Sequence, residues 1–497
     1  METGSPPARA SDERRAAEPS RREERAAGWL VFGVLAVSYA YFFQGGGWNP
    51  NSRLDLTRAL VERGTIRIDD YVANTGDWSR FDDHYYTNKA PGFSLLSIPF
   101  YVAGAAIGRG LFPDDGAAAL VVAGYVTNLG ANAVPAALLG VMLFHVLRRL
   151  GLADVELRAW AALAYGLGTL AFPYSTGYYG HQPGAVLGFA AFAALLRSKD
   201  AEHPWRWAAV AGGTAGTAVL VEMSTLVTTV ALGLVLLADR AGRGRLVAFV
   251  AAGVPPALVL FAYHQVAFGH PLAYGYLYSN PLVMYSTDSV LEAPRASRLF
   301  QLLLPESRGL LFTSPLFALA PLGWPRLLRS DARAAAVCLA VPASFLLLIA
   351  AFPGWHGGWT PGSRYLVPCL PFLFLPAALA MERFRLSGAV LGGISAAIML
   401  SIAAVAIEVP LRFENPLRDF VWPHLLSGDV SVNPQGLDEL WPPDGYLRLE
   451  QPDNWSSFNL GELAFPHSVA SVLPLVAVWC AGGIALRRLG RAPGRGR

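Results

Sequence analysis

Long apolar runs alternate with shorter polar segments from residue 28 to near the end of the chain. Most of the runs contain about 17–25 residues, which is the length that an α-helix needs to cross the hydrocarbon core of a bilayer. The pattern therefore predicts an all-α polytopic membrane protein with about 12 transmembrane helices, within a range of about 10–13. The predicted helices cover residues 28–45, 117–147, 157–174, 182–197, 206–221, 224–238, 245–266, 309–325, 334–352, 365–381, 388–408 and 467–486.

The polar segments define the expected domain organisation. The basic N-terminal segment lacks the early apolar core and the cleavage site of a signal peptide, so we expect a disordered cytoplasmic leader. In chain order we expect this leader at 1–27, a transmembrane module at 28–408 with an outer loop at 46–116, a second outer loop at 409–466, and the last helix with its basic cytoplasmic tail at 467–497.

The charged residues indicate how the helices are oriented. If the N-terminus is cytoplasmic and the helices alternate, most of the 39 Lys and Arg residues fall on the inner side and most of the 36 Asp and Glu residues on the outer side. Basic residues favour the cytoplasmic side of a membrane. We therefore expect a multi-pass protein of the inner (plasma) membrane with both termini in the cytoplasm. The modest net charge of +3 gives no indication of nucleic-acid binding.

The outer loop at 46–116 is the most polar part of the predicted membrane module. It contains most of the aspartates near the first helix and Lys89, one of only two lysines in the chain. We expect a short helix at 54–63, ended by Gly64, and an apolar helix from Gly92 to about Leu111 that lies along the membrane surface. Carboxylates and a rare lysine in such a loop indicate chemistry at the outer bilayer surface.

Asp55, Asp69 and Asp70 are the catalytic candidates. Asp55 lies three residues before Arg58, so it can form a helical surface ion pair or serve as a general base in a water-poor cleft, where burial raises a carboxyl pKa. The neighbouring side chains of Asp69 and Asp70 point apart, so at most one of them faces a site. Hard cations need several oxygen ligands that converge from different segments, so the sequence predicts no metal-binding residues. Whether the protein needs a divalent metal is left open by the sequence.

Lys89 is the strongest candidate for binding an anion. It immediately precedes the Pro91-Gly92 break that opens an apolar helix, and a helix N-terminus with an added ammonium suits a phosphate. Tyr85 and Tyr86 can stack on a sugar or line a lipid groove. The simpler alternative is a lysine that anchors the loop at the lipid headgroups.

The other substrate-binding candidates are spread along the chain. Each has a structural alternative: an interfacial hydrogen bond for the histidine, ion pairing for the carboxylate, loop capping for the arginines, and interface anchoring for the tryptophan. They are Arg53, His181, Glu222, Arg308, Trp355 and Arg364.

The motifs of the first loop resemble those of a known superfamily. The segment from Arg58 to Gly64 has the form R-x-L-x-x-x-G, and Tyr85 to Gly92 has the form Y-Y-x-x-K-x-P-G. Together they resemble the GT-C superfamily of integral-membrane glycosyltransferases, in particular the branch of protein O-mannosyltransferases and lipid A aminoarabinose transferases. The resemblance is closest over residues 28–150. Further along, Gly180-His181, Arg308–Pro315 and Trp355–Tyr365 resemble a bacterial group of transferase-like membrane proteins.

One departure from the resembled pattern concerns the catalytic acid. Relatives place an acidic residue at the exit of the first helix, where this chain has Asn49 or Asn51, and Asp55 is the nearest acid. Either Asp55 or another loop aspartate takes that role, or the transfer activity differs or is absent.

The resemblance implies inverting transfer of a sugar from a polyprenyl-phosphate-linked donor to an envelope acceptor, which is a glycan, lipid or protein, at the outer face. Lys89 would hold the phosphate, with Arg308 or Arg364, and Asp55 would deprotonate the acceptor. No cofactor is required beyond the lipid-linked donor. The alternatives are a lipid-linked glycan ligase or polymerase, a lipid transporter or flippase, and a non-catalytic envelope scaffold.

Overall fold

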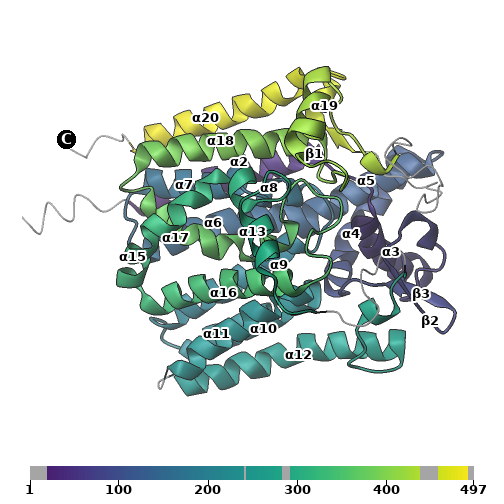
Figure 1. Cartoon of the computed structure of the whole chain (residues 1–497), viewed down its shortest axis with the longest axis horizontal. Helices are drawn as coiled ribbons and strands as arrows, with labels where there is room; N and C mark the ends of the chain where they lie inside the picture. Colours follow the sequence, from purple (N-terminus) through teal and green to yellow (C-terminus); the bar gives the residue numbers. More distant parts are fainter. Residues whose placement is uncertain (1–19, 240–241, 282–290, 437–456, 491–497) are drawn as a thin grey trace, which may run out of the picture.

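The computed structural model describes residues 20–239, 242–281, 291–436 and 457–490. Nearly all of its regular structure is α-helical, and the long helices run side by side in one bundle (Figure 1). The helices are α2 (Arg21–Tyr41), α3 (Trp48–Arg58), α4 (Gly92–Leu111), α5 (Gly116–Asn128), α6 (Val134–Arg149), α7 (Val155–Gly168), α8 (Ala171–Ser175), α9 (His181–Ser198), α10 (Pro204–Val221), α11 (Leu226–Ala238), α12 (Arg243–Phe268), α13 (Ala296–Leu303), α14 (Leu310–Thr313), α15 (Ala320–Ser330), α16 (Ala332–Ala351), α17 (Leu370–Ala380), α18 (Arg385–Val405), α19 (Trp422–Ser427) and α20 (Leu473–Gly490).

Among the described residues, six helical segments are long and apolar enough to cross a membrane. The prediction of a membrane protein rich in helices is therefore confirmed, whereas the count of about 12 is not. Two shorter apolar helices, 223–238 and 364–380, add to these six. The six are Gly92–Leu111, Gly116–Arg149, Arg243–Phe268, Ala332–Ala351, Arg385–Val405 and Val469–Leu489.

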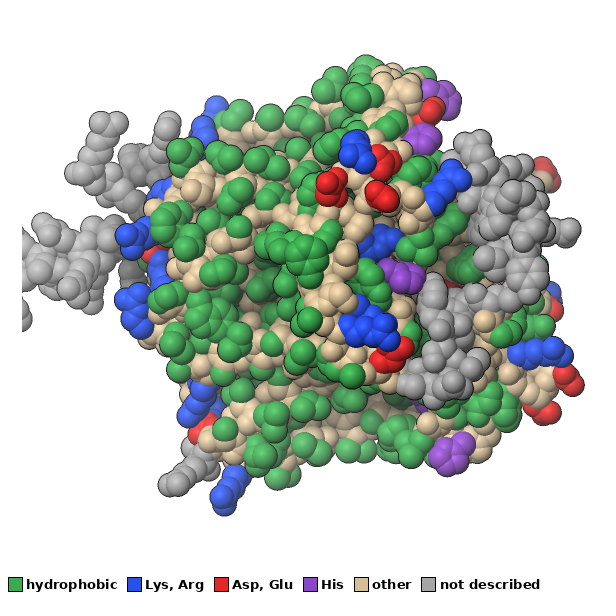
Figure 2. All heavy atoms as spheres, viewed as in Figure 1, with side chains coloured by type: hydrophobic (Ala, Val, Ile, Leu, Met, Phe, Trp, Pro, Cys, Tyr) green, Lys and Arg blue, Asp and Glu red, His purple; other side chains and the backbone are tan. Residues whose placement is uncertain are grey.

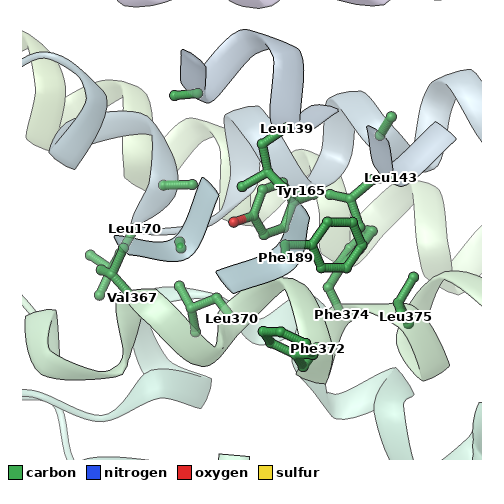
Figure 3. Packing of buried hydrophobic residues seen from close by; sticks show 14 of the residues in the cluster. Leu139, Leu143, Tyr165, Leu170, Phe189, Val367, Leu370, Phe372, Phe374 and Leu375 are labelled. Carbon is green, nitrogen blue, oxygen red and sulfur yellow. The ribbon is translucent and has the colours of Figure 1, made fainter. Parts of the chain in front are cut away.

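The centre of the bundle is a dry aromatic and aliphatic core. Tyr165 of α7 packs against Phe374 of α17 with ring centroids 5.4 Å apart, and Phe189 of α9 meets Phe372 edge-on at 5.6 Å (Figure 3). All four side chains are fully buried. Interdigitated packing of this kind fixes the helices that carry the polar groups described below.

Small residues let two of the long helices approach closely. A Cβ on Gly212 of α10 would lie 1.8 Å from the carbonyl oxygen of Phe249 in α12. Close backbone contact through small residues is a common way in which apolar helices pack in membranes.

Two short antiparallel pairs of strands lie outside the helices. Strand β2 (Trp78–Phe81) pairs with β3 (His84–Thr87), and β1 (Phe42–Phe43) pairs with β4 (Phe458–Asn459). The β2–β3 hairpin lies with α3 at the end of the molecule opposite the C-terminus (Figure 1).

The helix α2 begins earlier than the sequence predicted. The Ser20 hydroxyl oxygen accepts a hydrogen bond from the Glu23 amide, and the Glu23 carboxylate accepts one from the Ser20 amide, so a capping box starts the helix at Arg21. The expectation that 1–27 is disordered is therefore wrong for residues 21–27, and residues 1–19 lie outside the described part. Most of the predicted outer loop at 409–466 is described except 437–456.

The first loop contains the two expected helical segments. The helix expected at 54–63 starts earlier, at Trp48, continues as a π-helical turn over Ala59–Arg63, and ends at Gly64 with φ +66°. The apolar helix from Gly92 to Leu111 is observed as α4. Because α4 is itself long enough to span a membrane, its expected position along the surface stays a prediction.

Candidate functional site

The helix α3 carries an unusual concentration of buried polar side chains. Asn49, Ser52, Arg53 and Asp55 are all at most 5% exposed. Buried polar groups require hydrogen-bond partners, and on α3 these partners come from several distant segments. The helix therefore acts as the point at which those segments meet.

Arg53 is buried and forms an ion pair with the partly buried Glu222, and His181 lies beside this pair. The Nη2 atom of Arg53 lies 3.1 Å from Oε2 of Glu222, and Nδ1 of His181 lies 3.2 Å from the same oxygen. Arg53 also donates to the carbonyl oxygen of Val221 at 3.3 Å and to Oδ1 of Asn49 at 3.1 Å. The sequence left open whether Glu222 pairs with an arginine such as Arg308 or Arg364 or lines a donor groove; in the structure its ion-pair partner is Arg53.

Glycine at position 180 lets this arginine pack closely. A Cβ on Gly180 would lie 2.7 Å from Cζ of Arg53, so a larger residue would displace the guanidinium. The backbone before α9 therefore forms one wall of the Arg53 site, and His181, the first residue of α9, lies beside it.

Lys89 pairs with Asp77, which the β2–β3 hairpin brings opposite it. Trp78 pairs with Thr87 at the open end of the hairpin, so the residues just outside that pair are neighbours. Nζ of Lys89 lies 2.9 Å from Oδ2 of Asp77, and the ammonium lies 5.2 Å from the ring centroid of Tyr276. Both charged side chains are nearly buried.

Arg364 is a buried guanidinium between two aromatic rings. Its Cζ lies 5.5 Å from the ring centroid of Tyr179 and 5.4 Å from that of Tyr365. Its Nε has no hydrogen-bond partner, and no carboxylate forms an ion pair with it, in the part of the chain that the structure describes. A buried cation in such surroundings favours an anionic ligand.

Arg308 and His356 lie close to Arg364. Arg308 donates to the carbonyl oxygens of Thr360 at 2.7 Å and Gly358 at 3.4 Å, so it supports the turn that carries Arg364. Burial, followed by the charges of Arg308 and Arg364, lowers the pKa of His356 to about 4. The imidazole is therefore neutral at physiological pH in a strongly cationic environment.

Glu408 reaches the same region from the segment after α18. Its carboxylate accepts hydrogen bonds from the hydroxyl of Tyr179 and, at 2.8 Å, from Nε2 of Gln435. Burial raises the pKa of Glu408. The ring of Tyr179 also stacks on His181, with centroids 6.2 Å apart, so Tyr179 connects the groups described above.

These groups form one contiguous polar region at the outer end of the predicted topology. Figure 2 shows basic side chains at the left edge of one face and mixed acidic, basic and histidine side chains on its right, with mostly hydrophobic side chains between them. We call the following residues the polar cluster: Arg53, Asp77, Lys89, His181, Glu222, Arg364 and Glu408.

In the described part of the chain, the ion pairs and hydrogen bonds that define this cluster do not include the three sequence-predicted catalytic carboxylates. Asp55 is fully buried and accepts a hydrogen bond from Nδ2 of Asn74 at 3.2 Å. Its carboxylate lies 3.9 Å from Arg58, the i,i+3 partner that the sequence predicted. Asp69 accepts from the amide of Tyr85, and Asp70 pairs with Arg63 at 2.9 Å. Residues two apart on a helix point about 200° apart, which places Asp55 on a different face of α3 from Arg53.

The predicted aromatic contacts also lie elsewhere. Tyr86 is buried against Phe268, with ring centroids 5.6 Å apart, and Tyr85 packs edge-on against Trp78 at 5.1 Å. Trp355 is partly buried against the main hydrophobic core. Of the substrate-binding candidates, the structure thus brings together Arg53, Lys89, His181, Glu222 and Arg364, with Arg308 beside them.

Sequence reasoning missed Asp77, Tyr276 and Glu408 as site residues. The hairpin could have pointed to Asp77. Asp77 directly precedes strand β2 and Lys89 closely follows strand β3, so pairing of the two strands brings these residues near each other. Glu408 ends an apolar run and gave no separate signal. Among the described residues, no group of three or more His, Cys, Asp and Glu side chains is arranged to hold a metal ion.

No family model matches the chain, and no curated protein matches it. Among solved structures, it is similar to ArnT from Cupriavidus metallidurans bound to undecaprenyl phosphate, at 16% identity and a TM-score of 0.45, over 94% of this chain and 76% of ArnT. It is also similar to the archaeal oligosaccharyltransferase AglB from Archaeoglobus fulgidus in complex with an inhibitory peptide and a dolichol-phosphate, at 11% identity and a TM-score of 0.47, over 90% of this chain and 63% of AglB. Both are GT-C proteins. These two similarities, each at under 20% identity, are to proteins of the superfamily that the motifs of the first loop resemble.

Proposed function

We propose that the protein transfers a sugar from a polyprenyl-phosphate-linked donor to an envelope acceptor at the outer face of the membrane, with inversion at the anomeric carbon. The observation that supports this most is Arg364, a buried guanidinium without an ion pair in the described residues, next to Arg308 and the buried ion pairs of the polar cluster. A phosphate satisfies such a guanidinium through two parallel hydrogen bonds.

The positions of the three cations suit a donor held in lipid. Lys89 lies just before α4, Arg308 just before α14, and Arg364 opens the 3₁₀ turn that leads into α17. Lys89 therefore lies just before an apolar helix and Arg364 opens the turn that leads into another, and a helix N-terminus favours the phosphate of a membrane-embedded donor. The apolar faces of the helices would accommodate the polyprenyl chain.

The transfer needs charge stabilisation and one proton acceptor. The acceptor hydroxyl attacks the anomeric carbon while the bond to the phosphate oxygen breaks, so negative charge grows on the departing lipid phosphate. Fixed cations in a water-poor site stabilise that charge more in the transition state than in the ground state. A carboxylate nearby removes the proton of the attacking hydroxyl.

The binding half of the proposal is tested with purified full-length protein and undecaprenyl phosphate. Arg364→Met keeps the volume and removes the charge, and we expect it to weaken binding by about 10-fold or more, as expected for loss of a charge-assisted hydrogen bond. Lys89→Met should act in the same direction. The matched control is Arg80→Met, because Arg80 is half-exposed on the hairpin and pairs with Asp83 away from the cluster.

The transfer half is tested by mass spectrometry of envelope glycans and lipid-linked sugars in a deletion strain. We expect one envelope sugar to disappear and its lipid-linked donor to accumulate, with restoration by the unaltered protein but not by Arg364→Met. Binding without any change in the envelope would instead favour the scaffold or lipid-transport alternatives. An unchanged envelope together with no binding would refute the proposal.

A further inference from the structure

The exit of the first helix has no acidic residue of its own but receives one from a distant segment. Residues 45–54 contain neither Asp nor Glu. A Cβ built on Gly47, just before α3, would lie 2.5 Å from Oε1 of Glu408. The Glu408 carboxylate therefore rests on the Gly47 backbone at the entrance to α3.

The surrounding structure fixes this carboxylate in place. The chain leaves α18 at Val405, and the carbonyl oxygen of Val409 accepts a hydrogen bond from the amide of Thr360 at 3.0 Å. Thr360 in turn accepts from Arg308 through its carbonyl oxygen. One backbone hydrogen bond thus connects Val409, the residue after Glu408, to the turn that positions the proposed phosphate-binding arginines.

The three carboxylates of the polar cluster differ in their partners. Glu222 is paired with Arg53, and Asp77 is paired with Lys89. The Glu408 carboxylate accepts hydrogen bonds from the neutral side chains of Tyr179 and Gln435, and it forms no ion pair in the described part of the chain. The groups around Glu222, His181 and Arg53 among them, lower its pKa despite its burial, so Glu222 is a poor proton acceptor.

Tyr179 links Glu408 to the proposed phosphate site. Its hydroxyl donates to Glu408, while its ring faces the guanidinium of Arg364. A donor phosphate held by Arg364 would therefore lie on one side of this ring and the carboxylate at its edge. The proposed base and the proposed phosphate-binding cation thus share Tyr179 as a direct neighbour.

We propose that Glu408 is the general base of the transfer, which rests on the function proposed above. Its carboxylate takes the proton of the acceptor hydroxyl as that oxygen bonds to the anomeric carbon. The bond from the anomeric carbon to the phosphate oxygen breaks, and its electron pair leaves with the polyprenyl phosphate. The proton remains on Glu408 until water or the next acceptor removes it, and no co-reactant is needed.

Burial agrees with this role because it raises the pKa of Glu408. A general base is most effective when its pKa approaches the working pH. A purely structural role is the alternative: Gly47 is the residue before α3 and provides no side-chain cap, so a carboxylate beside it could stabilise the N-terminus of α3.

The two roles predict different results for Glu408→Gln. A general base predicts that transfer in the complemented deletion strain falls by about 100-fold or more, while undecaprenyl phosphate binding by the purified protein changes less than about 2-fold. It also predicts partial activity for Glu408→Asp, which keeps the acid. Glu414→Gln is the matched control, because Glu414 is exposed on the same segment, and we expect it to leave transfer unchanged.

Several results would overturn the proposal. Wild-type transfer by Glu408→Gln, with Arg364→Met still impaired, would remove Glu408 from the mechanism and leave the proposed function intact. Loss of transfer in Asp55→Asn but not in Glu408→Gln would make Asp55 the base. Equal loss of binding, thermal stability and transfer in Glu408→Gln would assign the carboxylate to capping α3. If the unaltered protein neither binds nor transfers, both proposals fail.

Discussion

Arg53 is the single residue that joins the most segments of the site. It contacts Asn49, the carbonyl oxygens of Ala90 and Val221, and the carboxylate of Glu222. Its guanidinium is almost fully buried. A residue with this set of partners holds α3, the start of α4 and the end of α10 in one arrangement.

Removing Arg53 should leave the partly buried Glu222 without its ion-pair partner. We expect Arg53→Met to lower the free energy of unfolding by about 3–5 kcal/mol, the usual effect of breaking a buried ion pair from one side. The measurement is the thermal midpoint of the purified protein in detergent. Adding Glu222→Gln should restore part of the loss, whereas Arg63→Met, which removes an exposed pair with Asp70, should change it by less than about 0.5 kcal/mol. Equal effects of Arg53→Met and Arg63→Met would contradict this account.

The raised pKa of Glu408 has a defined consequence for stability. A carboxyl whose pKa is higher in the folded than in the unfolded state favours folding below the unfolded value of about 4.3, and this contribution is lost as the pH rises through the folded pKa. Glu408→Gln cannot ionise, so we expect its thermal midpoint to exceed that of the unaltered protein by an amount that grows with pH and then levels off. Midpoints measured from pH 4 to pH 8 test this, with Glu414→Gln as the control. A constant difference at all pH values would count against the raised pKa.

The sequence predicted the types of residue in the site better than their partners. The pattern around Lys89 and the apolar surroundings of Glu222 were sufficient to select both residues, and both lie in the polar cluster. It could not tell that Asp55 and Arg53 lie on different faces of α3, because the start of that helix was placed too late. It also could not select Glu408, whose partners are 229 and 27 residues away in the chain.

At the scale of elements, α3 depends on glycine at its first turn. Gly47 has φ +95°, a conformation that side chains disfavour, and a Cβ there would overlap the Glu408 carboxylate. Gly64, which ends the same helical segment, has φ +66° but open space around it. Substitutions at the two glycines therefore distinguish the cost of backbone strain, which both share, from the cost of steric overlap, which only Gly47 has.

We expect Gly64→Ala to cost about 1–2 kcal/mol of unfolding free energy, which is the backbone strain alone. Gly47→Ala should cost more, by about 1–3 kcal/mol for the displaced carboxylate, and should also reduce sugar transfer. Thermal midpoints of both variants and envelope analysis of the complemented strains provide the measurements. A Gly47→Ala protein as stable and active as Gly64→Ala would mean that Glu408 does not need its observed place.

The contact between α10 and α12 allows a similarly matched test. A Cβ on Gly212 would lie 1.8 Å from the Phe249 carbonyl oxygen, whereas one on its neighbour Gly213 would be 3.7 Å from its nearest contact. We expect Gly212→Ala to destabilise the protein by about 1–3 kcal/mol, because the two helices must separate. Gly213→Ala should be neutral or stabilising by up to about 1 kcal/mol, since alanine favours helix. Thermal midpoints in detergent distinguish the two, and a smaller effect at Gly212 than at Gly213 would be incompatible with this packing.

Long uninterrupted apolar runs were the elements that could be predicted well. The run expected at 117–147 is one continuous helical segment, Gly116–Arg149, and 334–352 corresponds to Ala332–Ala351. The run expected at 157–174 instead breaks after Gly168 into α7 and α8. Apolar composition specifies burial in lipid or core equally well, so it does not reveal where a buried helix ends.

At the scale of the whole molecule, ion pairs connect the segments that are predicted to be cytoplasmic with one another. Pairs join Arg149 with Asp200, Lys199 with Asp331, and Arg385 with Asp154, each linking loops that alternate with the segments around the polar cluster. The polar cluster lies in the opposite set of loops, with the β2–β3 hairpin at the end away from the C-terminus (Figure 1). The side of the membrane that each set of loops faces stays a prediction.

Which of the two ends faces outward decides whether a lipid-linked donor can be used in the proposed way. The basic residues of the C-terminal end predict that this end is cytoplasmic, because Lys and Arg are retained there. We expect a membrane-impermeant maleimide to label Asp83→Cys, at a 91% exposed hairpin position, in intact cells. Asp200→Cys, at a 63% exposed position of the opposite end, should react only after the membrane is opened. The native cysteines should contribute little, because Cys338 and Cys369 are buried and Cys480 lies within an apolar helix long enough to cross the membrane. Labelling of Asp200→Cys but not Asp83→Cys in intact cells would place the polar cluster on the cytoplasmic side, where transfer to an acceptor at the outer face could not occur.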